Sequence, residues 1–169
     1  MIHGDEASFR QDSTLHRTWA RSGVQPCIPV TGQRKSVKVF GSVELFSARF
    51  WYQIAGVFNA QTYLVYLERL ARAYFPRKTF LIQDNASYHK DKTVWGWFKD
   101  HQKWLTVWNL PPYCPELNAT ERLWHHTRIT GTHNRYFISV DELYDTLSRV
   151  FRSMQQVPQQ IRGYLQPFC

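Results

Sequence analysis

A short apolar run at residues 80–82 constrains the fold of this chain more than any other stretch. The run contains Phe, Leu and Ile between polar residues that favour turns, which is the pattern of a buried central strand. Asp84 follows two positions after the run. Because ligands of α/β sheets bind at the carboxyl ends of the strands, this carboxylate is placed to face a cleft. The alternative is that Asp84 and Asn85 only form an Asx turn.

The composition indicates one globular domain that spans residues 1–169. Apolar residues make up 43% of the 169 residues and aromatic residues 16%, which supplies a core and excludes a disordered chain. The 21 Lys and Arg residues outnumber the 13 acidic residues, and the formal charge is +8. This charge favours a polyanionic partner, nucleic acid before membrane.

The sequence predicts no membrane partner and a cytoplasmic location. No apolar run approaches the roughly 18 residues of a membrane span, and the first residues have no apolar leader core. The cysteines Cys27, Cys114 and Cys169 are too scattered for a disulfide framework or for a zinc site with close cysteine pairs. They fit a reducing cytoplasm.

The remaining patterns predict strands first and then alternating helices and strands. Residues 36–43 alternate apolar and polar side chains, and residues 50–57 complete an antiparallel hairpin with them. Residues 10–29 are expected to form a loop with one short strand. Helical periodicity and caps place helices at residues 60–74, 90–101, 118–129 and 139–157, with a strand at 105–109. The predicted fold class is α/β, a mixed sheet flanked by helices, with the last helix as a peripheral addition.

Three carboxylates occupy positions that suit a metal site. Asp5 ends a possible first strand, Asp84 ends the central strand, and Glu121 lies on the first turn of the third helix. Oxygen ligands from separate elements suit Mg²⁺ or Mn²⁺, and two such ions can activate a nucleophile and stabilise the leaving oxygen at a phosphate. The alternatives are that Asp5 and Glu6 are solvated surface charges and that Glu121 only closes a capping box with Asn118.

Four stretches together resemble the DDE transposases of the Tc/mariner superfamily, in their bacterial insertion-sequence branch. They are residues 5–9 (DEASF), 30–35 (VTGQRK), 83–89 (QDNASYH) and 112–124 (PYCPELNATERLW). The resemblance implies a ribonuclease-H-like fold in which Asp5, Asp84 and Glu121 bind two Mg²⁺ or Mn²⁺ ions. It also implies hydrolysis at transposon ends and transfer of the 3′-hydroxyl to target DNA, with a homodimer and a bacterial, nucleoid-associated location.

The sequence departs from the family in three ways, of which the mildest is Ala119 and Thr120 where the family commonly has Pro-Ile. Family members carry helix-turn-helix DNA-binding units before the catalytic domain, and none is seen here. We therefore expect a catalytic domain alone: one product of a split reading frame, with a separate N-terminal helix-turn-helix polypeptide as partner, or a truncated copy, or an excised domain. In addition, His3 and Gly4 stand where the family has apolar residues, which is expected to weaken the strand that should hold Asp5.

Five further residues are candidates for DNA contacts. Arg34, Lys35 and Lys38 on an early hairpin are expected to contact phosphates. His89 matches the family's histidine and contacts phosphate or a metal-bound water, unless it only makes a turn hydrogen bond. Arg122 contacts the DNA backbone unless it lies on a solvated helix face. The tryptophans of the second half are expected in the core rather than as base-stacking platforms: Trp95, Trp97, Trp104, Trp108 and Trp124.

The sequence leaves two alternatives to a transposase catalytic domain. The first is an inactive relic that binds DNA or a partner chain through its basic surface. A ribonuclease acting on RNA–DNA hybrids would keep the fold, but the helical C-terminal part and the Pro-Glu-Leu-Asn block at residues 115–118 argue against it.

Overall fold

A five-stranded sheet with the order β3-β2-β1-β4-β5 forms the centre of the molecule. The strands are β1 (Ile2–Arg10), β2 (Ser36–Glu44), β3 (Arg49–Ala55), β4 (Thr79–Gln83) and β5 (Leu105–Asn109). β1, β2 and β3 are antiparallel, whereas β4 and β5 run parallel to β1. The computed structural model describes residues 1–112 and 114–168, with the side chains of 167 and 168 excepted, so Tyr113 and Cys169 lie outside the described residues.

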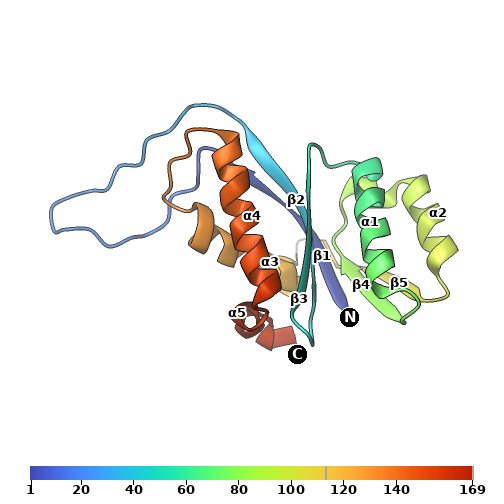
Figure 1. Cartoon of the computed structure of the whole chain (residues 1–169). Helices are drawn as coiled ribbons and strands as arrows, with labels where there is room; N and C mark the ends of the chain where they lie inside the picture. The colour runs from blue at the N-terminus through green and yellow to red at the C-terminus, as the bar shows by residue number, and fades with distance from the viewer. Residues whose placement is uncertain (113, 169) are drawn as a thin grey trace.

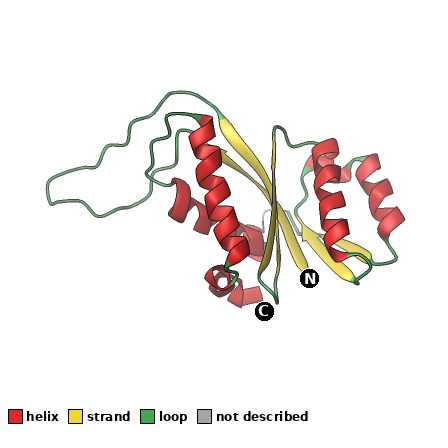
Figure 2. Cartoon of the chain, viewed as in Figure 1, coloured by secondary structure: helices red, strands yellow, loops and turns green. Residues whose placement is uncertain are grey.

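Helices cover both faces of this sheet. They are α1 (Ala60–Tyr74), α2 (Lys92–His101), α3 (Ala119–Thr127), α4 (Val140–Gln156) and the short α5 (Gln159–Arg162). Figure 1 shows α1 and α2 on one face and α3 and α4 on the other, and Figure 2 shows the strands as one layer between them. The mixed sheet flanked by helices that the sequence predicts is confirmed. In the described part of the chain, no helix has both the length and the hydropathy that crossing a bilayer requires.

The two faces carry separate apolar clusters. On the α1 and α2 face, Phe40 of β2 stacks on Tyr66 of α1, with ring centroids 5.5 Å apart. On the other face, Phe50 of β3 packs against Phe151 of α4 at 5.8 Å. Aromatic rings bury large apolar areas and pack edge-on or offset, so these pairs hold the helices to the sheet.

α4 belongs to the core, and the prediction of a peripheral last helix is wrong. Its residues Leu143, Leu147 and Phe151 have no exposed surface and join the cluster on the β2 and β3 face. Ser139 caps the helix, as predicted, by accepting a hydrogen bond from the Glu142 amide. The apolar stripe of this helix therefore fills a face of the sheet that would otherwise meet water.

Residues 11–35 form a long excursion between β1 and β2, and the short strand predicted within them is not formed. In Figure 1 this segment, drawn in blue, reaches away from the body beyond α4. Its base is closed by Asp12, whose carboxylate accepts hydrogen bonds from the amides of Thr31 and Gly32. Trp19 is 99% exposed along it. The excursion is thus anchored at its base and presents apolar surface to solvent.

Candidate active site

The register of β1 and β4 brings Asp5 and Asp84 to the same level of the sheet. Ile2 pairs with Leu81 and His3 with Ile82, and the same offset continued along both strands aligns Asp5 with Asp84. The pairing of β1 with β4 stops at His3. The two carboxylates therefore lie where these parallel strands separate, which is where ligands bind in such sheets.

β1 is longer than predicted, and Asp5 does not end it. The strand continues to Arg10 because β2 pairs with it from Ile2 to Arg10. The expected weakening by His3 and Gly4 is also wrong, because His3 is 4% exposed and serves the fold. Its Nδ1 accepts a hydrogen bond from the Ala119 amide at the start of α3, at 3.3 Å. The small Gly4 packs against Leu81 of β4.

The start of α3 directs Glu121 into the site. Asn118 caps the helix by accepting a hydrogen bond from the Thr120 amide at 3.1 Å. The amide of Asn118 itself donates to the carbonyl of Pro115 at 3.0 Å, which leaves no role for Glu121 as its cap. In the described residues, no hydrogen bond to the Glu121 carboxylate is found, so this carboxylate is open to a ligand.

Asp5 is buried in the site and held by one indole. Its side chain is 8% exposed, and its Oδ2 accepts a hydrogen bond from Nε1 of Trp124 at 2.9 Å. Burial, and then the negative charge of Glu121, raise the pKa of Asp5 to about 8. Burial also raises the pKa of Glu121, against the opposing charge of Arg128. Loss of hydration and nearby negative charge both disfavour an ionised carboxylate, which is why these pKa values are raised.

Asp84 differs because two donors stabilise its charge. Burial disfavours its ionised form, but hydrogen bonds from His89 and from the Ala86 amide outweigh burial and lower the pKa of Asp84. The His89 ring is 1% exposed and bridges Nε2 to Glu6 at 3.0 Å and Nδ1 to Asp84 at 3.2 Å. Burial opposes its protonation, yet these two carboxylates raise the pKa of His89 to about 9. His89 is therefore a buried cation that fixes Asp84.

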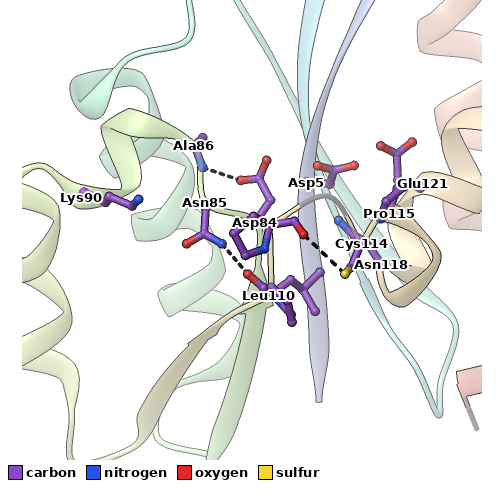
Figure 3. A pocket seen from close by; sticks show the side chains of 12 residues that line it. Asp5, Asp84, Asn85, Ala86, Lys90, Leu110, Cys114, Pro115, Asn118 and Glu121 are labelled. Carbon is purple, nitrogen blue, oxygen red and sulfur yellow. Dashed lines mark hydrogen bonds between the residues drawn. The ribbon is translucent and has the colours of Figure 1, made fainter.

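Asp5, Asp84 and Glu121 line one cavity of about 490 Å³. In Figure 3 their carboxyl groups point to the same side, with Asp5 drawn between the other two. Within residues 1–112 and 114–168, the one cluster of ligand atoms all within 4.8 Å of one another is Glu6, Asp84 and His89, not these three carboxylates. In that cluster His89 pairs with both Glu6 and Asp84, and Asp84 belongs to this cluster as well as to the cavity lining.

The donor set of the cavity fits a hard divalent cation. Asp5, Asp84 and Glu121 offer carboxylate oxygens from a strand, a strand end and a helix start. Mg²⁺ and Mn²⁺ prefer such ligands, and a cation would relieve the charge effects that raise the pKa of Asp5 and Glu121.

The predicted DNA contacts lie outside the lining of this cavity. Arg34 and Lys35 are exposed where the excursion returns to β2, and Lys38 lies half-buried with its Nζ 5.5 Å from the Phe58 ring. Arg122 is exposed on α3. A direct phosphate contact by His89 does not fit the structure, because both ring nitrogens are buried against carboxylates.

Sequence reasoning missed several residues of the site. Lys90 lines the cavity next to His89, and Asn118 lines it as well as capping α3. The one signal for Lys90 was a positive charge beside the Asp-Asn turn.

The expected core placement holds for two tryptophans and fails for others: Trp104 and Trp124 are buried, Trp97 is half-buried, and Trp95 and Trp108 are exposed.

Comparison with known proteins identifies what this arrangement is similar to. A family model described as a DDE superfamily endonuclease matches residues 1–144. An insertion element IS630 uncharacterized 39 kDa protein from Shigella sonnei is 23% identical over 159 residues, which cover 94% of this chain and 46% of that protein. The chain therefore spans about half the length of this curated relative.

Solved structures with the same fold come from the Mos1 transposase. A pre-cleavage Mos1 transpososome matches with a TM-score of 0.66 and 16% identity, over 98% of this chain and 54% of that chain. A Mos1 mariner paired end complex with Mn gives 0.68 and 16%, over 98% and 53%. The catalytic domain of Mos1 mariner transposase gives 0.58 and 15%, over 98% and 78%. The predicted ribonuclease-H-like fold is confirmed.

Proposed function

Because this chain belongs to the DDE superfamily endonucleases, as its Tc/mariner-like motifs predicted, we propose that it is the catalytic domain of a transposase. It cuts transposon-end DNA and joins the 3′-hydroxyl ends to target DNA. The observation that carries this proposal is the convergence of Asp5, Asp84 and Glu121 on one cavity. Three acidic groups from three elements are what phosphoryl transfer with divalent cations needs.

In this proposal Asp5, Asp84 and Glu121 hold two Mg²⁺ or Mn²⁺ ions. When bound, the ions supply activation of the attacking hydroxyl and stabilisation of the leaving oxygen. Asp84 enters ionised, because His89 and the Ala86 amide stabilise its charge. Asp5 has a pKa raised to about 8, so it gives up a proton when a cation binds. Asp84 and Asp5 thus differ in protonation before a cation binds.

Positive groups around the cavity suit a DNA backbone. Lys90 lines the cavity opposite the acidic helix start, and the whole chain carries a formal charge of +8. We place a phosphate contact at Lys90 and keep Arg34, Lys35, Lys38 and Arg122 as candidates farther along the surface. Such contacts position DNA without reading its sequence.

The proposal includes two protein partners. The first is a second copy of this chain, because paired-end complexes are known for the Mos1 transposase and the excursion presents Trp19 and Leu15 to solvent. The second is a separate helix-turn-helix polypeptide that selects the transposon ends. Its support is that members of the family that the motifs resemble carry helix-turn-helix DNA-binding units.

A nicking assay with a thermal melt tests the function. The wild type is expected to nick supercoiled plasmid only with Mg²⁺ or Mn²⁺, and these ions are expected to raise its melting temperature, because a ligand that binds the native state stabilises it. Asp84→Asn is expected to abolish nicking and remove most of the metal-induced shift. Asp100→Asn, at an exposed position of α2, is the matched control and is expected to behave as the wild type.

The outcomes separate the proposal from its alternative. Undiminished nicking by Asp84→Asn, or equal metal-induced shifts in both proteins, would overturn the assignment of the acidic trio. A wild type that binds DNA but neither nicks nor responds to metal would support the inactive DNA-binding relic.

A further inference from the structure

We propose that Trp124 is a positioning residue that fixes the carboxylate of Asp5 for metal binding, and that Gly41 provides the space that the Trp124 indole occupies. This inference rests on the proposed function. Trp124 Nε1 donates to Asp5 Oδ2 at 2.9 Å, and the indole is 1% exposed. One carboxylate oxygen is thereby engaged and the rotation of the carboxyl group is fixed. Groups that hydrogen-bond a metal ligand orient it in this way.

Gly41 makes room for the indole beside Asp5. It pairs with Asp5 across β1 and β2. A Cβ at position 41 would meet Cη2 of Trp124 at 2.3 Å and Cζ2 at 2.8 Å, so the ring lies directly on the backbone of β2. The backbone of Gly41 is not left-handed, unlike that of Gly23 and Gly32. What glycine supplies at this position is therefore space rather than conformational freedom.

The plane of the indole is set by the core around it. The rings of Phe9, Phe50 and Phe151 pack edge-on against Trp124 with centroids 6.0 to 6.2 Å away. These contacts alone would describe an ordinary core tryptophan. The acceptor of its N–H, however, is a carboxylate that lines the cavity rather than a backbone carbonyl.

The same helix carries the third acidic residue. Trp124 follows Glu121 by three positions on α3, so the two side chains lie on neighbouring sides of one helix turn. The Oγ1 of Thr120 donates to the carbonyl of His3 at 2.8 Å and ties the start of α3 to β1. α3 therefore sets Asp5 through Trp124 and presents Glu121 as a single rigid unit.

Metal affinity tests the role of the indole N–H. The probe is Mn²⁺ alone, titrated by calorimetry into the complete chain. Replacing Trp124 by benzothienylalanine keeps the ring shape and removes only the N–H donor. This change and Trp124→Phe are each expected to weaken Mn²⁺ binding about 10- to 100-fold, the usual effect of removing a group that orients a metal ligand. Trp104→Phe is the matched control, because Trp104 is buried in the cluster on the other sheet face.

The role of Gly41 is tested by substituting it alone and together with Trp124. Gly41→Ala is expected to displace the indole and weaken Mn²⁺ binding, whereas Gly96→Ala, where a Cβ meets no atom within 4 Å, is expected to change it less than about twofold. Trp124→Phe removes the two indole atoms that the new Cβ would meet most closely and leaves only Cε2 of Phe50, at 3.3 Å, of the three nearest atoms. Gly41→Ala is therefore expected to lower the unfolding midpoint less in the Trp124→Phe background than in the wild type.

The results separate this inference from the proposed function. Mn²⁺ binding by the benzothienylalanine variant as tight as by the wild type would overturn the positioning role and leave the function standing. A wild type that binds no Mn²⁺ would overturn the metal function itself. The contact is also read without metal: Asp5→Asn is expected to shift the indole N–H resonance of Trp124 and not that of Trp104, and an unmoved Trp124 resonance would refute the contact.

Discussion

At the scale of single residues, two aspartates of one site have pKa values shifted in opposite directions. The pKa of Asp5 is raised to about 8 by burial and the charge of Glu121, whereas that of Asp84 is lowered by donors from His89 and Ala86 against its own burial. The difference comes from what each carboxylate faces rather than from residue type. Asp84 lies against the His89 ring, whereas Asp5 faces negative charges, with that of Glu121 the largest, and accepts hydrogen bonds only from neutral donors.

This difference predicts how pH affects the metal-free protein. The folded-state pKa of Asp5 lies above its unfolded value of 3.8, so protonated Asp5 stabilises the fold below that value, and this stabilisation is lost as pH rises toward 8. Asp5→Asn keeps an acceptor for Trp124 but does not titrate. From about pH 5 to about pH 8, the free energy of unfolding of the wild type is expected to fall relative to Asp5→Asn by up to about 1.4 kcal/mol per pH unit.

Urea unfolding of both proteins in chelator checks this. The difference between their unfolding free energies is expected to level off above about pH 9, where Asp5 is ionised in both the folded and the unfolded state. A difference that stays constant over the whole range would show that Asp5 is ionised in the native protein at neutral pH.

At the scale of elements, α3 is the part that assembles the site. It has only nine residues, and a helix of that length is marginal in isolation. Contacts with β1 supply what the helix lacks: the Ala119 amide donates to His3 Nδ1 and the Thr120 hydroxyl donates to the His3 carbonyl. The helix therefore forms at the place and angle that β1 dictates.

Thr120→Val tests this docking. Valine keeps the shape of the buried threonine but removes the hydroxyl that donates to the His3 carbonyl at 2.8 Å. Loss of a buried hydrogen bond is expected to lower the free energy of unfolding by about 1–3 kcal/mol. Thr130→Val is the control, because the Thr130 hydroxyl also binds a carbonyl but is exposed, and a change within about 0.5 kcal/mol is expected. Equal effects in urea unfolding would remove the special role of Thr120.

At the scale of the whole molecule, the site lies between the two apolar clusters that cover the two faces of the sheet. Asp5 points to the α3 face, where Trp124 belongs to one apolar cluster, and its neighbour Glu6 points to His89 on the other face. The ring of His89 packs against that of Tyr63 in the second cluster, with centroids 4.4 Å apart. The cavity thus opens where β1 and β4 separate and both cores hold its walls rigidly.

The net charge predicts weak DNA binding that depends on salt and not on sequence. Phosphate contacts release counterions, so the logarithm of affinity is expected to fall linearly with that of salt, by roughly 0.9 per phosphate contacted. Lys90→Ala, in the cavity lining, is expected to reduce this slope by about one, whereas Arg72→Ala, on the last turn of α1, is expected to leave it unchanged. Fluorescence anisotropy with two unrelated duplexes measures both. Salt-independent or site-selective binding would contradict the prediction.

The sequence by itself determined the elements whose signals are local. α1 has the predicted bounds because Asn59 caps it and Pro76 follows its end, and β4 with Asp84 is where the apolar run placed it. The cap at Asn118 could also be predicted from the sequence, since capping depends on residues only a few positions apart. Each of these features depends on one short stretch of chain.

Only the tertiary structure decided the length of β1, the burial of α4 and the surroundings of each carboxylate. β1 extends past Asp5 because β2 pairs with it, and Asp5 meets Trp124 across 119 positions of sequence. Such contacts depend on which faces pack together, and a local pattern shows that a face is apolar without showing what covers it. The acidity of Asp5, set by burial and the charge of Glu121, therefore belongs to the assembled fold.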